Sequence, residues 1–329
     1  MEFDINAELE DSRFDAYAQR LRESLGSLTE NPRNDALETA VFARQLEHIY
    51  TKTYDVLYPE FKARKFIPLD SSVPSGASSF TYRQFDEVGF AKMVANYADD
   101  IPDVTLFGKE FTANCHSMVV GYSYSIQDIR RAQMAGLPLT DQLARIAKRA
   151  VEAKIDSIAA FGDSTLGFTG FLNNANVPLV SVITGTWSTA TADQIVADLD
   201  KLVNSIVIAT KGVHMPDTLL LDISSFTLLN SKQRSLASDV TILKWYLANN
   251  AFITNIDHWY LLATADAAGT GKRAVCYQRN QDVLGLVIPQ EFEQFPPQVK
   301  NLSFFVPCHA RIGGVKIPYP LAIAYMDGI

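Results

Sequence analysis

The chain has 329 residues, of which 47% are hydrophobic and 20% are charged, so it is long enough for two domains or one elaborate domain with a buried core. Its formal net charge of −8 argues against a dedicated nucleic-acid-binding protein, which would carry a basic stripe. Three cysteines without a CxxC pair favour free thiols in a reducing compartment, and no apolar stretch is long enough for a signal peptide or a membrane span.

Residues 1–65 are predicted to form a helical arm without a core of its own. Asn31-Pro32 separates two amphipathic stretches, in which apolar side chains recur at intervals of three and four residues. The apolar positions are Phe14, Tyr17, Leu21, Leu25 and Leu28 in the first stretch, and Leu37, Val41, Phe42, Leu46, Ile49 and Tyr50 in the second.

A long two-stranded hairpin is predicted between Ser79 and Ser125. Its returning half, KEFTANCHSMVVGYSYS (109–125), is rich in β-branched and aromatic residues and is expected to be one strand. A two-stranded hairpin is only marginally stable unless it packs on something. Little in a single copy of the chain is available for that packing.

The strongest helix signal runs from Pro138 to Phe161, a length of ~35 Å, after a shorter helix in SIQDIRRAQMAG. Its apolar face is predicted to consist of Leu143, Ile146, Ala147, Ala150, Val151, Ile155, Ile158 and Ala159. Its polar face is predicted to consist of Arg145, Lys148, Arg149, Glu152 and Asp156. Because acids lie among the basic residues, a solvated face is favoured over a nucleic-acid contact.

The next stretch, GDSTLGFTGFLNN (162–174), has two glycines spaced as in a phosphate-binding loop. Phe168 stands where that loop has its lysine, and the stretch follows a helix instead of a strand. We therefore interpret it as a helix stop and turn at Gly162, Gly167 and Gly170, with Gly162 in the left-handed conformation after the last helical residue.

Residues 178–290 alternate helices and strands and are predicted to form a compact α/β block. Helices are expected at 191–212, where Thr191 and Gln194 form a capping box, and at 224–231 and 238–250. Strands are expected at 217–222, 255–264 and 282–292, and a flexible loop at 265–274. Residues 291–329 are strand-rich and are expected to rejoin the part of the chain that holds the long helix.

No catalytic, cofactor or metal site is predicted. The Cys115-His116 and Cys308-His309 pairs lie in expected strands, where neighbouring side chains point to opposite faces, so one ion would need adjacent strands to gather its ligands. Buried free thiols are the default interpretation. The sequence also lacks the G-x-S-x-G signature of a nucleophilic serine.

The order of these elements resembles the major capsid protein of tailed bacteriophages, of the Hong Kong 97 fold. The resemblance covers about residues 75–174, in which SGASSFTYRQFDEVGFAKMVANYADDIPD is similar to the extended loop and LPLTDQLARIAKRAVEAKIDSIAAFGDSTLGFTGFLNN to the spine helix and its glycine turn. It implies an α+β fold with an N-terminal arm (1–65), extended loop and peripheral strands (66–125), spine helix and glycine turn (126–177), axial α/β domain (178–290) and peripheral return strands (291–329).

The resemblance also implies a function. Copies of the chain would form an icosahedral shell of hexamers and pentamers around phage double-stranded DNA, without sequence-specific DNA binding, a membrane or a cofactor. Portal, scaffolding and decoration proteins would be its other partners, and the extended loop would supply assembly contacts. The implied contact residues are Phe85, Val88, Phe90, Met93, Val94 and Tyr97.

Two alternatives remain open at this point. One is an encapsulin-type compartment of the same fold around a cargo enzyme. The other is a soluble enzyme that binds a nucleotide in the α/β block. In the type member a lysine of the extended loop forms a covalent cross-link, and the matching stretch NYADDIPD contains no lysine. A cross-link is therefore not expected here.

Overall fold

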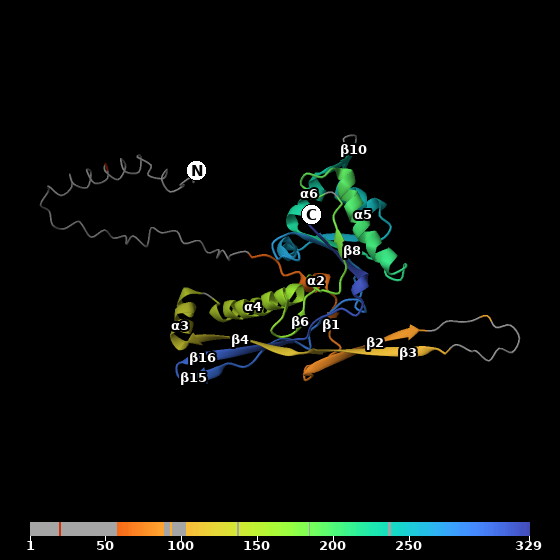
Figure 1. Ribbon diagram of the computed structural model, residues 1–329. Coiled ribbons are helices and arrows are strands. Elements are labelled where there is room, and N and C mark those ends of the chain that lie inside the picture. Colours follow the sequence, from red (N-terminus) through yellow and green to blue (C-terminus); the bar gives the residue numbers. More distant parts are fainter. Residues whose placement is uncertain are drawn as a thin grey trace, which may run out of the picture. The chain divides into compact units, whose positions relative to one another are not determined.

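The computed structural model describes Arg20, Met93 and residues 58–88, 103–136, 138–183, 185–235 and 238–329 (Figure 1). The chain divides into two units, Met1–Tyr58 and Pro59–Ile329, and the second contains all the elements whose bounds follow. The amphipathic stretches predicted for the arm lie, apart from Arg20, outside the described residues.

The second unit mixes helices and strands along its whole length. Its helices are α2 (Ala63–Phe66), α3 (Ile126–Ala135), α4 (Leu139–Phe161), α5 (Ala192–Ala209), α6 (Ile223–Ser231), α7 (Ile242–Asn249) and the 3-10 helices η2 (Tyr260–Thr264) and η3 (Pro320–Ala322). Its strands are β1 (Leu69–Asp70), β2 (Ser79–Val88), β3 (Thr105–Asn114), β4 (His116–Ser125), β5 (Gly162–Asp163), β6 (Phe168–Thr169), β7 (Leu179–Ser181), β8 (Thr218–Leu221), β9 (Gln233–Ser235), β10 (Ser238–Thr241), β11 (Asn255–His258), β12 (Arg273–Tyr277), β13 (Gly285–Val287), β14 (Gln290–Gln294), β15 (Gln298–Lys300), β16 (Ser303–Ile312), β17 (Gly314–Lys316) and β18 (Ile323–Asp327).

A five-stranded sheet organises the α/β block, in the order β11-β8-β12-β18-β7. β8 and β11 are parallel, as are β18 and β7, whereas β12 runs antiparallel to both of its neighbours. α5 packs on this sheet and begins at the predicted capping box, in which the Thr191 N–H donates to Gln194 Oε1 at 2.7 Å. β18 belongs to this sheet, although residues 291–329 were expected to return to the long helix.

The second large sheet is built around β16. β4 pairs antiparallel with β16 over its whole length, from His116↔Ile312 to Ser125↔Ser303, while β14 and β15 follow each other along the opposite edge of β16. α4 packs on β4 and β16 through Ala147, Val306 and Cys308. Residues 109–125 are thus two strands and not the predicted one, because the chain changes partner at Cys115: β3 pairs with β2, and β4 with β16.

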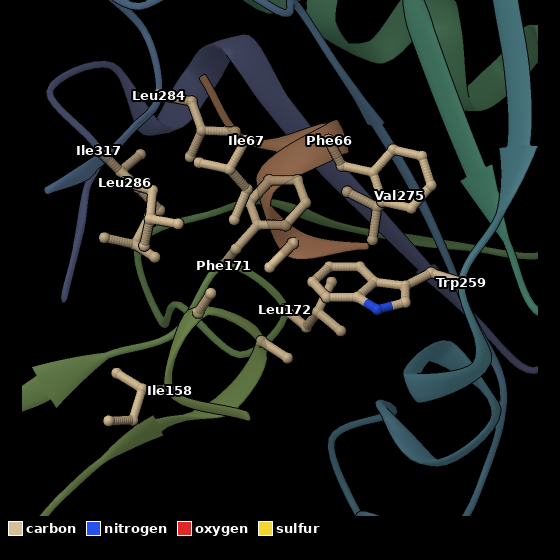
Figure 2. Close-up of a cluster of buried hydrophobic side chains, with 14 of the residues drawn as sticks. Phe66, Ile67, Ile158, Phe171, Leu172, Trp259, Val275, Leu284, Leu286 and Ile317 are labelled. Carbon is tan, nitrogen blue, oxygen red and sulfur yellow. The ribbon is translucent and has the colours of Figure 1, made fainter. Parts of the chain in front are cut away.

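One apolar cluster joins segments that are far apart in the sequence. Figure 2 shows Phe66 and Ile67 from the end of α2 close to Phe171 and Leu172, which follow the glycine turn, and to Trp259. The Phe66 ring lies 5.6 Å from that of Trp259, and all five side chains are at most 1% exposed. The segment after Tyr58 is therefore part of the core, and the expected arm boundary at residue 65 falls inside α2.

The long helix α4 occupies the predicted residues, but the predicted face is wrong for three of them. Ile146, expected on the apolar face, is 63% exposed, and Ala150 is exposed as well. Asp156, expected on the polar face, is 1% exposed. The reason is α2, which lies across the last turns of α4 and needs an acceptor there: the Ala63 N–H donates to Asp156 Oδ1 at 2.8 Å.

Three further segments differ from the sequence prediction. Residues 238–250 begin as strand β10, and the helix starts only after Thr241, whose hydroxyl accepts the Lys244 N–H at 3.4 Å. Residues 255–264 leave the strand at His258, where the pairing with β8 ends at Leu221, and continue as η2. The expected loop 265–274 runs into β12, whose every residue is buried.

A first testable prediction concerns Asp156, whose pKa burial raises above its ordinary value of 3.8. The folded chain then holds this proton more tightly than the unfolded chain. The free energy of unfolding should therefore gain a contribution as the pH falls through the raised pKa towards 3.8, and lose it as the pH rises. In Asp156→Asn, which keeps an oxygen for the Ala63 N–H, this contribution should be absent.

The measurement is urea unfolding of both chains at a series of pH values from neutrality downwards. The stability of the wild type relative to the variant should increase towards low pH and be constant above the raised pKa. A difference that shrinks on acidification would contradict the assignment, because it would mean that the folded state prefers the charged carboxylate.

Candidate functional site

The β2–β3 hairpin exposes several large apolar side chains. Ten antiparallel pairs connect the two strands, from Ser79↔Asn114 to Val88↔Thr105, and each strand pairs with no other strand among the described residues. The base of the hairpin rests on the core: a Cβ at Gly313 would lie 2.8 Å from the Phe80 ring, so that ring lies directly on the Gly313 backbone. The rest extends away from its own subunit (Figure 1).

The predicted contact residues fall partly on this hairpin. Phe85 is 59% exposed in β2, and Met93 is fully exposed. Val88 is the last residue of β2, where only its backbone is described. Phe90, Val94 and Tyr97 lie outside the described residues.

The two faces of the hairpin differ in chemistry. On one, which we call the aromatic face, Tyr82 stacks on Phe111 with ring centroids 5.2 Å apart and an interplanar angle of 16°. The described side chains of this face are Phe80, Tyr82, Gln84, Asp86, Thr105, Phe107, Lys109, Phe111 and Ala113. On the other, the paired face, polar side chains bind each other across the strands. Its described side chains are Ser79, Thr81, Arg83, Phe85, Leu106, Glu110, Thr112 and Asn114, together with Gly108.

Three exposed apolar residues of β3 were not among the predicted contact residues. Leu106, Phe107 and Phe111 are 60%, 57% and 41% exposed in β3. The signal for two of them was present: Phe107 and Phe111 are four residues apart in a strand, so they share a face. Because TLFGKEF (105–111) mixes apolar, charged and glycine residues, that alternation was not recognised from the sequence.

The glycine turn holds the end of α4 against the chain that follows it. β5 and β6 pair through Gly162↔Thr169 and Asp163↔Phe168. Gly162 has φ +73° and ψ −165°, so its φ is positive as expected but it is not in the left-handed helical conformation predicted. Since the turn leads from a helix into β6 and not from a strand into a helix, it lacks the geometry that gathers backbone N–H groups around a phosphate.

Close backbone contact is the reason for two of the three glycines. A Cβ at Gly162 would lie 2.3 Å from the Phe168 carbonyl oxygen, and one at Gly170 would lie 2.4 Å from that of Ala160. Gly167 has open space around it, so the reason for glycine at this position is its positive φ of +74°, which the turn requires. Asn173 completes the junction, because its Nδ2 donates to the Phe161 carbonyl at 2.6 Å and its Oδ1 accepts the Gly170 N–H at 3.1 Å.

One basic residue of α4, Arg149, contacts the chain that precedes α2. Arg149 lies over the Phe61 ring at 5.7 Å. Arg64 of α2 bridges Glu152 of α4, at 2.9 Å, and Glu291 of β14, at 2.8 Å. The hydrogen bond from Arg64 holds the pKa of Glu291 below its ordinary value, and Lys148 adds to this effect. Arg145 and Lys148 are exposed.

The register of β4 and β16 separates the two Cys-His pairs. The strands are adjacent, but His116 lies opposite Ile312 whereas Cys308 lies opposite Val120. Four residues of strand correspond to ~13 Å, which is too far for one ion. All three cysteines are free and buried, and no metal-ligating cluster occurs among the residues that the structure describes. Within the same residues, no helix has the length and apolarity needed to cross a membrane.

Solved structures of phage capsids share this fold. The capsid of Myoviridae phage XM1 matches with a TM-score of 0.79 at 15% identity, over 88% of this chain and 99% of that one. A structure from Mycobacterium phage Ogopogo gives a TM-score of 0.58 at 13% identity, over 85% of this chain and 96% of that one. A virus-like particle from Pyrococcus furiosus gives 0.52 at 13% identity, over 80% and 90%.

The comparison with curated protein sequences found no match. A family model described as "Major capsid protein", however, matches residues 89–329, which is most of the chain. The α+β fold of Hong Kong 97 type implied by the sequence agrees with the phage capsid structures, and the chain is a structural protein of a capsid shell. The chain therefore belongs to the major capsid protein family.

Proposed function

We propose that copies of this chain form a closed icosahedral shell of hexamers and pentamers that encloses phage double-stranded DNA. The observation that carries the proposal is the β2–β3 hairpin, whose base packs on its own subunit at Phe80 and which exposes Phe85, Leu106 and Phe107 beyond it. Two strands alone are marginally stable. A neighbouring subunit in a shell supplies the missing support.

The parts of the chain would then have distinct roles. The residues before Pro59 would be an arm that contacts neighbours. The five-stranded sheet, which includes β18, together with α5 would form the axial domain around the five- and six-fold positions. The hairpin, α4 and β16 would belong to the peripheral domain. Gly162, Gly167 and Gly170 would fix the angle between the two domains, because the turn they form joins α4 to the core that contains Phe171.

The proposal also concerns partners and location. The net charge of −8 suits an inner surface that binds duplex DNA weakly and without sequence preference, because tight binding requires many neutralised phosphates. Portal, scaffolding and decoration proteins are the candidate protein partners. The subunit would be made in the cytoplasm of the bacterial host, would act without catalysis or a cofactor, and would end in the virion.

Neither alternative from the sequence is favoured. An encapsulin-type compartment would share the fold. However, the match to the phage XM1 capsid has a TM-score of 0.79 and covers 99% of the XM1 chain. A nucleotide-binding enzyme gains no support from the phosphate-loop spacing of the segment 162–170, because that segment follows a helix and contains no lysine.

The test is assembly of the full chain, expressed alone and together with the scaffolding candidate from its own genome. Sedimentation and negative-stain microscopy should show closed shells with five-fold vertices that contain nucleic acid and no enzyme cargo. As a control, replacing residues 81–112 by a short turn should leave a folded subunit that forms no shells. A monodisperse monomer under both conditions would contradict the proposed function.

A further inference from the structure

We propose that α2 is a strap that fixes the angle between α4 and the five-stranded sheet, and that this angle responds through α2 to the position at which the N-terminal arm is held. The inference rests on the proposed function, in which the arm contacts neighbouring subunits, and adds a device inside the subunit on which those contacts would act. The glycine turn joins α4 to the core through the covalent chain, whereas α2 joins α4 to the sheet through hydrogen bonds and ion pairs.

The first set of contacts connects α2 to α4 and to the sheet that α4 covers. The Ala63 N–H donates to Asp156 Oδ1 at 2.8 Å, and Arg64 Nε donates to Glu152 Oε2 at 2.9 Å. A second nitrogen of Arg64, Nη1, donates to Glu291 Oε1 of β14 at 2.8 Å. The Arg64 guanidinium therefore holds α4 and β14 to α2 at the same time.

The second set of contacts connects α2 to the end of β11 in the five-stranded sheet. Lys65 forms an ion pair with Asp257, and Lys62 Nζ donates to the His258 carbonyl oxygen at 2.9 Å. Successive residues of a helix point about 100° apart, which allows Arg64 and Lys65 to bind different parts of the subunit. A single turn of helix thus bridges the two domains.

The charged contacts of α2 are the part that is able to change partners. The side chains of Arg64 and Lys65 are 30% and 60% exposed, and ion pairs in contact with water are held only weakly. Phe66 and Ile67, in contrast, are buried in the apolar cluster at the end of α2 (Figure 2). α2 therefore has a fixed end in the core and an exchangeable end where the arm enters.

The connection between the arm and α2 is short. Four residues, Pro59–Lys62, separate the unit Met1–Tyr58 from the first residue of α2, and they span at most ~14 Å. Phe61 within this connection already lies against Arg149 of α4, with the guanidinium 5.7 Å from the ring. A neighbour that holds the arm beyond this reach must draw α2 away from α4 or from β11. Hexamers and pentamers place the same chain in different surroundings, and α2 would convert that difference into a change of angle.

A distance measured within one subunit tests the hold of α2 on the two domains. Nitroxide labels are placed at Ile146→Cys of α4 and Ile208→Cys of α5, which are 63% and 75% exposed, while the native thiols are buried. Lys65→Glu should widen the distribution of label distances by about twofold, because it places two carboxylates together at β11. Lys65→Glu with Asp257→Lys keeps two cations and one carboxylate there and should restore the original width.

The matched control breaks an exposed ion pair that lies within one domain. Lys154 and Asp163, at 3.4 Å, connect α4 only to its own glycine turn. Lys154→Glu should therefore leave the width unchanged. The measurement uses double electron–electron resonance on the full chain, both unassembled and in shells that contain a small fraction of labelled subunits.

A flexible insertion tests the coupling to the arm. In the wild type, the mean distance between the labels should differ between the unassembled subunit and the shell. A linker of about six Gly and Ser residues between Tyr58 and Pro59 should remove about half of this difference or more, because a flexible chain transmits no pull. The same linker after Gly269, in the exposed turn before β12, should leave the difference intact.

The outcomes separate this inference from the function on which it rests. If shells form but Lys65→Glu leaves the width unchanged, the distance is the same in both states, or the insertion at Tyr58 has no effect, α2 is not a strap while the shell function stands. If the wild-type chain forms no shells, the proposed function fails and the dependence on the arm fails with it. The charge-reversal variants then still decide, in the unassembled subunit, whether α2 fixes the angle.

Discussion

Gly170→Ala is expected to lower the free energy of unfolding of the subunit by about 3 kcal/mol, at the upper end of the usual cost of overpacking. The added methyl group would lie 2.4 Å from the Ala160 oxygen and the Phe161 carbonyl carbon, and 2.6 Å from the Gly162 nitrogen. All three are backbone atoms, so no side chain can rotate away. Relief requires that α4 and β6 move apart, which opens the core around Phe171.

Two other glycines provide controls in the same urea-unfolding measurement. Gly167→Ala has open space and should cost about 1 kcal/mol, for its positive φ alone. Gly76→Ala has open space and no positive φ, so its stability should change by less than about 0.5 kcal/mol. Equal effects of Gly170→Ala and Gly167→Ala would mean that the close approach of α4 and β6 is not what this position requires.

The second large effect is expected for Asp327→Ala, at about 3–5 kcal/mol, because it leaves a buried charge without its partner. Arg273 is 4% exposed and binds both carboxylate oxygens of Asp327, with Nε to Oδ1 at 2.6 Å and Nη2 to Oδ2 at 2.7 Å. Its remaining nitrogen donates to the Leu172 carbonyl, and its guanidinium lies 4.6 Å from the Tyr325 ring. The pair thus joins β12 and β18 to the segment after the glycine turn.

The control for this variant is an exposed ion pair. Glu110→Ala removes the partner of Arg83 on the hairpin surface and should cost about 1 kcal/mol or less. The double variant Arg273→Met with Asp327→Leu should regain much of the loss, since replacing both ions with apolar side chains leaves no charge uncompensated. Chemical denaturation of the three variants checks these values. A loss in Asp327→Ala no greater than that in Glu110→Ala would show that the buried pair does not stabilise the sheet.

Local patterns were enough to predict several elements. The helix Leu139–Phe161 follows from more than six turns of 3.6-residue periodicity, and α5 from its capping box at Thr191. α3 ends at Gly136, which has φ +67°. These features depend on residues within a few positions of each other, so the sequence contains the whole signal.

What could not be predicted depends on partners distant in the sequence. Asp156 is buried because Ala63, 93 residues earlier, presents its N–H there. β12 was mistaken for the end of a loop because Arg273 resembles a solvated residue until Asp327, 54 positions later, neutralises it. For the candidate site, the existence of a hairpin was predictable, but the faces of Phe85 and Phe111 follow from the pairing register, which no local pattern specifies.

The place of β18 in the five-stranded sheet has a consequence for synthesis of the subunit. β18 lies between β12 and β7, and β7 precedes it by more than 140 residues. A nascent chain that has not yet reached Asp327 therefore has a gap inside this sheet, and β7 has no strand to pair with. The sheet is complete only after translation passes that residue, and fragments released early by the ribosome retain unpaired strand edges.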